Sequence, residues 1–330
     1  MPSRRAFVAG TIAVLSARPF APAWSDEKSS ERVYRVGFLD TESAAANAAN
    51  LVQFQKGMKE LGYTEGRNLT SEYRSAEGRN ERLQELAARL VRKKVDVIVT
   101  RGTPAALAAK NAPGETPVVT AGVVDPVETK LIDSFERPGG KVTGLGFTVK
   151  EVETKRIDLL RAVAPNRKRI AALLNMGNPA IAETWKVTEE AALSFGMQAM
   201  LFDVRKPEDA MAALQAAVEK QAEALIVRLG ALGDGQRRAF VEAAARYKLP
   251  AVYGSRQYVD AGGLISYGVN PSHLYYRAAS FVDRIFKGAK PGELPMEQPT
   301  KFEMIVNRKA VRSLGLVLPP DLLLRSDEII

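Results

Sequence analysis

The order of predicted strands and helices occurs twice along this chain, and this repeat restricts the fold more than any other feature of the sequence. In the first copy, a predicted strand at 35–40 is followed by a helical pattern that ends at Gly62. In the second copy, an apolar run at 169–175 is followed by a helical pattern that ends at Gly196. Glycine suits the left-handed residue after a helix, so both patterns predict a helix end at a corresponding point.

Each copy then continues through the same series of elements. The predicted pairs are strands 68–73 and 197–204, helices 83–92 and 210–220, strands 95–100 and 224–228, and strands 117–120 and 250–253. The helix of the first copy carries its apolar residues at Leu51, Phe54, Met58 and Leu61, the spacing of one helix face. Strands that alternate with helices are typical of βαβ units, so we predict an α/β fold with two open parallel-sheet lobes.

Two glycine-containing segments, 144–148 and 268–271, are the predicted links between the lobes. A helix predicted at 274–287 returns to the first lobe, because that lobe otherwise lacks a covering helix, and a strand at 301–306 belongs to the second. The predicted boundaries are 33–146 plus 270–296 for lobe 1 and 147–269 plus 297–330 for lobe 2. A chain that crosses more than once forms a hinge, and we expect the lobes to close on a ligand.

Residues 1–23 have the three parts of a secretory signal peptide, which are a basic start, an apolar run at 6–17 and a small-residue cleavage pattern. The apolar run is about half the roughly 20 residues that a membrane-spanning helix needs. We expect cleavage after Ala23 and a periplasmic protein. Arg4 and Arg5 resemble the twin-arginine export motif, and the general secretion route stays open. No cysteine follows the apolar run, so we do not expect a lipoprotein.

The chain has no cysteine and a single histidine, His273. Thiol nucleophiles, disulfides and Cys- or His-rich zinc sites are therefore excluded, and we expect no metal, no cofactor and no catalytic set. No dinucleotide-binding glycine pattern, P-loop or nucleophile elbow occurs either. The net charge is +9, and three of the positive charges, Arg4, Arg5 and Arg18, lie in the predicted signal peptide. The remaining positive charge is spread along the sequence, which argues against a nucleic acid partner.

Ligands of open α/β sheets bind beyond the carboxyl ends of the strands. The candidate binding residues at these positions are Asp40, Thr41, Ser43, Gly102, Thr103, Asp125, Asn175, Asn178, Arg228, Tyr253 and Tyr267. Thr103 and Pro104 predict a helix start with Thr103 as its N-cap, where free N–H groups attract an anion or the cap is purely structural. Asp125 can hold an amine or begin a helix. Arg228 can pair with an anion or with acids of the protein, and the two tyrosines can stack on a ligand or pack.

A series of short motifs runs through residues 33–330. They are GMKELGY at 57–63, VDVIVT at 95–100, GTPAA at 102–106, DPV at 125–127, RPGG at 137–140, VTG at 142–144, YG at 253–254, AGGL at 261–264, SYG at 266–268, QPTKF at 298–302 and a tail with PP at 319–320 and LL at 323–324. In this order they resemble the solute-binding proteins of ABC transporters, in the group that includes tryptophan- and phenylalanine-binding members.

The resemblance implies a type I periplasmic-binding-protein fold that binds a small-molecule solute in the cleft and delivers it to an ABC permease and its ATPase in the inner membrane. It implies an aromatic or other hydrophobic amino acid, with the carboxylate at the helix start of Gly102 and Thr103 and the ammonium near Asp125. Arg101 stands where many such loops carry a small residue, which favours a second carboxylate on the solute. We expect a monomer without enzyme activity.

Three other classes of protein share parts of this pattern. A ligand-sensing partner of a membrane receptor has the same lobes and export signal, and the sequence does not separate it from a transport protein. An exported α/β enzyme needs a catalytic set, which the sequence lacks. A two-lobed repressor needs an N-terminal helix-turn-helix, and the predicted signal peptide stands in its place.

Overall fold

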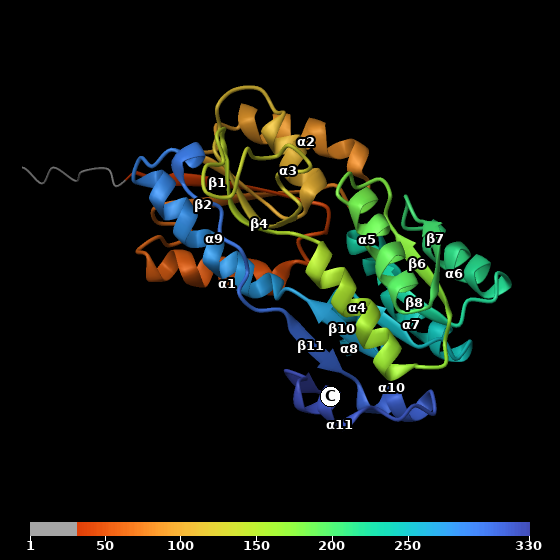
Figure 1. Cartoon of the computed structure of the whole chain (residues 1–330). Coiled ribbons are helices and arrows are strands. Elements are labelled where there is room, and N and C mark those ends of the chain that lie inside the picture. Colours follow the sequence, from red (N-terminus) through yellow and green to blue (C-terminus); the bar gives the residue numbers. More distant parts are fainter. Residues whose placement is uncertain (1–31) are drawn as a thin grey trace, which may run out of the picture. The chain divides into compact units, whose positions relative to one another are not determined.

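The first sheet of this computed structural model, which describes residues 32–330, contains five parallel strands in the order β2-β1-β3-β4-β5. Its strands are β1 (Tyr34–Asp40), β2 (Leu69–Ser75), β3 (Val97–Thr100), β4 (Val118–Val124) and β5 (Val142–Phe147). The helices of this lobe are α1 (Ala48–Glu60), η1 (Asn80–Arg82), α2 (Leu83–Arg92), α3 (Thr103–Lys110) and α9 (Pro271–Phe286). Helices α1 and α9 pack together on one face of the sheet, and α2 and α3 cover the other (Figure 1). The predicted signal peptide lies outside the described residues.

The second sheet has the order β12-β11-β10-β9-β8-β6-β7, and it is parallel except where β10 meets β11. Its strands are β6 (Arg169–Leu174), β7 (Gln198–Asp203), β8 (Ala224–Arg228), β9 (Ala251–Tyr253), β10 (Ile265–Gly268), β11 (Glu303–Val306) and β12 (Glu328–Ile329). The helices are α4 (Lys150–Val163), α5 (Ile181–Ser194), α6 (Asp209–Glu219), η2 (Gly230–Gln236), α7 (Arg237–Arg246), α8 (Arg256–Asp260), α10 (Arg308–Ser313) and α11 (Pro320–Leu324). One core joins α4, α5, α10 and α11, and another joins α6, α7 and α8. The prediction of two parallel-sheet lobes is confirmed.

Corresponding helices of the two lobes end as the glycine pattern predicts. Gly62 has a φ of +92° and Gly196 a φ of +69°, both in the left-handed region. The apolar face of α1 is formed by Phe54 and Met58, which are buried. The prediction that Leu61 belongs to this face is wrong, because α1 ends at Glu60 and the side chain of Leu61 is 39% exposed.

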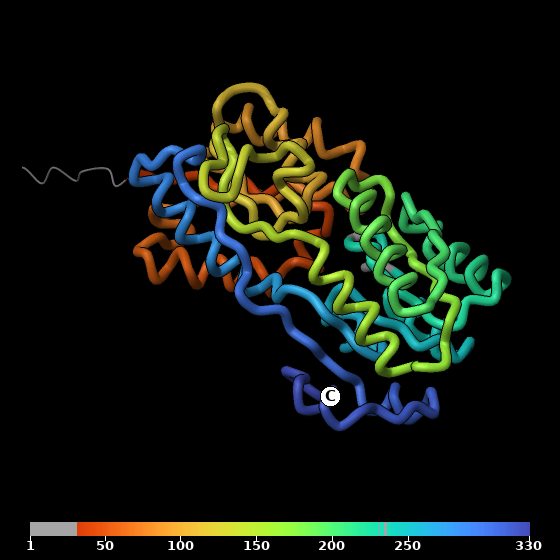
Figure 2. Tube along the Cα trace, viewed as in Figure 1, coloured from red at the N-terminus to blue at the C-terminus, as the bar shows by residue number. Residues whose placement is uncertain are grey.

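The chain passes between the two sheets three times. It leaves β5 for α4, returns from β10 to α9, and passes again after the short 3-10 helix η3 (Pro291–Glu293) to reach β11. Glu297 still pairs with Leu145 beside the first sheet, so the third passage follows Glu297. These connections can be followed in Figure 2. They position the strand ends of both lobes around one cavity.

Candidate functional site

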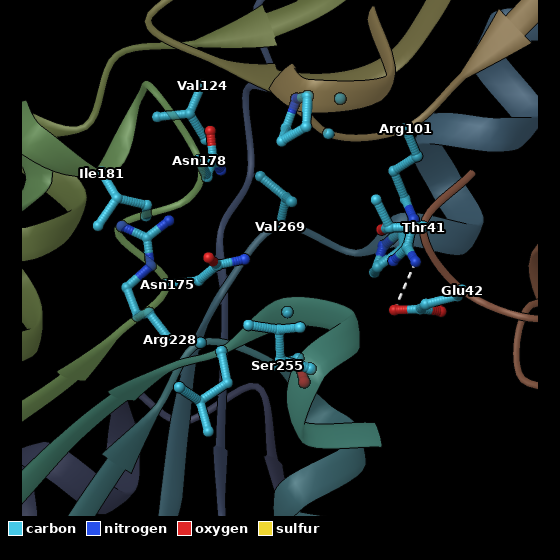
Figure 3. A pocket seen from close by; sticks show the side chains of 18 of the residues that line it. Thr41, Glu42, Arg101, Val124, Asn175, Asn178, Ile181, Arg228, Ser255 and Val269 are labelled. Atoms are coloured by element: carbon cyan, nitrogen blue, oxygen red, sulfur yellow. Dashed lines mark ion pairs between the residues drawn. The ribbon is translucent and has the colours of Figure 1, made fainter. Parts of the chain in front are cut away.

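A cavity of about 240 Å³ is lined by loops that follow strands of both sheets. Figure 3 shows Thr41, Glu42 and Arg101 from the first lobe on one side and Asn175 and Arg228 from the second on the other. The strands of each lobe run parallel, so their carboxyl ends gather at one edge and present these loops together.

Five of the eleven candidate residues line this cavity, and they come from both lobes. They are Thr41, Gly102, Asn175, Asn178 and Arg228. The others are engaged in contacts with the rest of the protein and are not among the lining residues. These are Asp40, Ser43, Thr103, Asp125, Tyr253 and Tyr267.

Asp40 lies behind the cavity wall, where it is almost fully buried. Its carboxylate accepts hydrogen bonds from the Glu42 backbone at 2.9 Å, from Asn47 at 3.1 Å and from the Tyr275 hydroxyl at 2.7 Å. Burial raises the pKa of Asp40 above its ordinary value, and the nearby charge of Arg101 opposes that rise. Because donors approach both oxygens, the group acts as an acceptor that fixes the loop after β1.

The Arg101 guanidinium pairs with acids of the β1 loop. Its Nη2 lies 2.5 Å from Glu42 Oε1, and its Nε lies 3.5 Å from Asp40 Oδ2. Burial alone would lower the pKa of Arg101, but the two carboxylates raise it well above the ordinary value. Arg101 therefore stays charged at the cavity wall.

Helix α3 begins differently from the sequence prediction. Its N-cap is Gly102, whose φ of +82° suits glycine, and Pro104 occupies the first turn. The Thr103 hydroxyl donates a hydrogen bond to the Val124 carbonyl at 3.1 Å, and its oxygen accepts one from the Val124 N–H at 3.3 Å. The prediction that Thr103 caps the helix is wrong, because its hydroxyl ties α3 to the end of β4.

Asp125 is buried at the end of β4, in a left-handed conformation with a φ of +45°. Its Oδ1 accepts the Val149 N–H at 2.9 Å, whereas its buried Oδ2 has no hydrogen-bond partner among the described residues. Burial raises the pKa of Asp125 to about 6, and the hydrogen bond from Val149 opposes this rise. Turns follow Asp125, so it does not begin a helix.

The remaining candidates have local roles. Ser43 Oγ accepts the Ala46 N–H at 3.2 Å. Tyr253 is buried with its ring stacked on Tyr258 at 4.7 Å, and Tyr267 stacks on Phe302 at 5.9 Å.

One buried carboxylate beside the cavity is shared by two arginines. Glu153 Oε1 accepts from Nη1 of both Arg156 and Arg228, while Thr184 Oγ1 lies 3.3 Å from Nη1 of Arg228. Arg156 also donates from Nε to the Tyr267 carbonyl at 2.8 Å. Burial lowers the pKa of Arg156 to about 10, partly offset by Glu153, so Arg156 is protonated at neutral pH.

Sequence reasoning missed Glu153 and Arg156. They lie inside α4 rather than in a loop after a strand, and a Glu and an Arg three residues apart on a helix are usually a surface pair. Their full burial in a cavity wall depends on how α4 packs against the second sheet. The sequence carries no signal of this.

Two further features concern the chemistry of residues 32–330. Within this range no helix has both the length and the apolar character needed to cross a membrane. In the same range no cluster of three or more His, Asp or Glu side chains forms a candidate metal site. The residues that line the cavity carry charged, amide and apolar groups.

Known proteins resemble this chain in sequence or in fold. The tyrosine-binding protein of Clostridioides difficile (strain R20291) is 24% identical over 263 residues, which cover 80% of this chain and 75% of that protein. A structure of a conserved domain protein from Vibrio cholerae has a TM-score of 0.84 and 26% identity, over 91% of this chain and 100% of that one. An ABC domain from Streptococcus pneumonia in complex with L-Trp has a TM-score of 0.83 and 22% identity, over 90% of this chain and 100% of that one.

A family model described as "ABC transporter substrate binding protein" matches residues 41–330, which include every strand except β1, the hinge and every lining residue of the cavity. This match assigns binding rather than catalysis, with a solute and a transporter as partners. The chain belongs to the family of ABC transporter substrate-binding proteins.

Proposed function

We propose that this protein binds one amino acid with an aromatic or other hydrophobic side chain in the cavity between its sheets and delivers it to an ABC permease in the inner membrane. The observation that carries this proposal is the composition of the cavity, which combines charged and amide groups with a large apolar wall. Polar groups fix the orientation of a small ligand, and apolar groups provide most of its contact area.

The size of the cavity supports a solute of this kind. Its volume of about 240 Å³ is below the roughly 300–1,000 Å³ of sites for drug-sized ligands. The apolar wall contains Phe147, Ile181, Val227, Leu229, Leu232 and Leu274. A single amino acid suits this combination better than a sugar, because a sugar leaves its hydroxyls against apolar side chains without partners.

The relatives support the same ligand class. One is a tyrosine-binding protein, and one solved structure contains L-Trp. At 24% and 22% identity, these ligands indicate a class of solute rather than one solute. The signal-peptide pattern of residues 1–23 supports a periplasmic location, where a substrate-binding protein meets its transporter.

A ligand screen tests the proposal. The protein would be purified from residue 24 onward and then unfolded with denaturant, and the small molecules that this releases would be identified by mass spectrometry. The refolded protein would then be screened against the twenty amino acids by thermal shift and calorimetry. We expect an aromatic or branched hydrophobic amino acid to raise the melting temperature, because a ligand that binds only the folded state stabilises it. A screen in which no amino acid binds, with another solute released from the native protein, would contradict the proposal.

A further inference from the structure

The loop that follows β2 reaches from the first lobe to the second. This loop, residues 77–80, connects β2 to the helix η1, which begins at Asn80. Gly78 and Asn80 line the cavity. Asn80 Nδ2 also donates to the Gly177 carbonyl of the second lobe, at 3.5 Å. One short loop is therefore both a part of the cavity wall and a contact between the lobes.

The loop packs closely against the second lobe at Gly78, which is buried. A Cβ on Gly78 would lie 3.2 Å from Pro207 Cγ and 3.4 Å from Leu232 Cδ2. The proline is held in place, because Gln236 Nε2 donates to the Pro207 carbonyl at 2.8 Å. A side chain at position 78 is therefore crowded unless the lobes move apart.

Hydrogen bonds within the first lobe fix the shape of this loop. Glu77 and Gly78 have φ values of +54° and +79°, so two successive left-handed residues turn the chain sharply. The Gly78 N–H donates to the Thr41 carbonyl at 2.8 Å. The Glu77 N–H donates to Ser75 Oγ at 3.0 Å, and the Glu77 carboxylate pairs with Arg82 at 3.0 Å. A loop that is already fixed loses little conformational freedom when the lobes meet.

The contacts of this loop lie far from the hinge. β2 is the outer strand of the first sheet, at the opposite edge from β5, where the first passage between the sheets begins. Pro207 and Glu208 follow β7, the outer strand of the second sheet at the edge away from β10 and β11. Arg79 and Glu208 add an ion pair at 4.0 Å, which contributes little because both side chains are exposed. A hinge rotation moves distant atoms most, so these contacts break when the lobes open.

Resting on the solute binding proposed above, we propose that residues 77–80 form a latch that favours the closed lobes and sets how slowly a bound solute leaves. A solute enters and leaves while the lobes are apart, whereas the latch contacts form only when the lobes are together. Contacts of this kind raise the closed population, with or without solute, and they slow dissociation more than they change association. The latch residues are positioning residues, because they act through closure.

Asparagine at position 78 tests the latch. Asn accepts a left-handed backbone more readily than most residues, so Gly78→Asn changes the space between the lobes more than the backbone strain. The matched control is Gly66→Asn. Gly66 has the same φ of +79° in the same lobe, and no atom of the described residues lies within 4 Å of its Cβ position.

The first readout is the pair of binding rates, measured by surface plasmon resonance. The probe is L-tryptophan, L-tyrosine, L-phenylalanine or L-leucine, whichever binds the unchanged protein most tightly. We expect Gly78→Asn to speed dissociation at least about fivefold and to change association less than about twofold. Gly66→Asn should change neither rate. If dissociation from Gly78→Asn is as slow as from Gly66→Asn, or if the loss of affinity lies in association alone, the latch is excluded.

A compensating change in the other lobe makes the test specific. Pro207 Cγ is the atom nearest to the Cβ position of Gly78, so Pro207→Ala makes room for the new side chain. We expect Gly78→Asn combined with Pro207→Ala to recover part of the slow dissociation. Urea unfolding of the two asparagine variants establishes that both are folded. A double variant that dissociates as fast as Gly78→Asn alone would show that the crowding does not arise between the lobes.

A second readout needs no ligand and separates the latch from the proposed solute. The chain has no cysteine, so Glu85→Cys on α2 and Glu190→Cys on α5 would place one spin label on each lobe. Double electron-electron resonance then measures the distances between the lobes in the empty protein. We expect Gly78→Asn to shift these distances to larger values and Gly66→Asn to leave them unchanged. The same distances in both variants would overturn the latch, even if none of the four amino acids binds.

Discussion

The Asp125 carboxylate accepts the backbone N–H of Val149 at 2.9 Å, and this hydrogen bond joins the end of β4 to the start of α4. Val149 lies in the first passage of the chain between the sheets, and Asp125 holds it from the end of the neighbouring strand β4. Asp125 is therefore part of the hinge and lies behind the cavity wall rather than in it.

Its titration gives a prediction on stability. The pKa of Asp125 is raised from 3.8 to about 6 in the folded protein, so the folded state holds a proton that the unfolded state releases. The contribution of Asp125 to the free energy of unfolding therefore falls as pH rises from about 4 to about 6. Asn cannot ionise, so the free energy of unfolding of Asp125→Asn, measured relative to that of the unchanged protein, should be higher at pH 7.5 than at pH 4. Urea unfolding at both pH values measures this, with the exposed Asp209→Asn as control. If the difference in the free energy of unfolding between Asp125→Asn and the unchanged protein is the same at both pH values, Asp125 does not titrate in this range.

The shared carboxylate gives a second prediction. Glu153→Gln leaves the buried Arg156 and the partly buried Arg228 without their shared counter-charge, so the free energy of unfolding should fall by about 3–5 kcal/mol. Glu190→Gln on the exposed side of α5 is the matched control and should stay within about 0.5 kcal/mol. Denaturant titration of both variants checks this. A similar loss in the free energy of unfolding of the two variants would contradict the prediction.

Closure of the lobes can be tested with a crosslink. Asn80 of the first lobe donates to the Gly177 carbonyl of the second at 3.5 Å, and a Cβ on Gly177 would lie 3.9 Å from Asn80 Nδ2. The chain has no cysteine, so Asn80→Cys with Gly177→Cys can form only one intramolecular disulfide. We expect bound solute to speed its formation under mild oxidation and to reduce the radius of gyration in small-angle scattering. The single-cysteine variants are the controls. If bound solute changes neither the rate of crosslinking nor the radius of gyration, ligand-driven closure is excluded.

The apolar wall should contribute through contact area. Phe147 lines the cavity and is partly buried. Phe147→Ala should weaken the binding of an aromatic amino acid by about 1.5–3 kcal/mol, which corresponds to roughly 10- to 150-fold in affinity. Phe195→Ala removes a comparable partly buried ring outside the cavity and should leave affinity unchanged. Calorimetry on both variants distinguishes a contact with the solute from a general loss of packing.

Export is testable apart from ligand binding. Protein from a periplasmic extract should begin at Trp24, as read by intact mass and N-terminal sequencing. Arg4→Lys together with Arg5→Lys should block export only if the twin-arginine route is used. A full-length chain retained in the cytosol would rule out the signal peptide.

The sequence predicts the fold well because the repeated order of elements and the two helix-ending glycines are local patterns. The return of α9 follows from the need of the first lobe for a covering helix. It predicts part of the cavity as well, since Thr41 and Asn175 follow strands and Arg228 ends one, and the ends of parallel strands gather at one edge. It does not predict Glu153, because the direction in which a helix residue faces is decided by packing between α4 and the second sheet.

Neither lobe is built from one continuous stretch of chain. The first needs α9 to cover one face, and the second needs β11, which pairs with β10 only after the chain has passed through α9. During synthesis the N-terminal part emerges first, but it lacks the pieces that complete either core. Stable folding of either lobe therefore waits for the last part of the chain, so a truncation that removes residues after β10 should leave both cores incomplete.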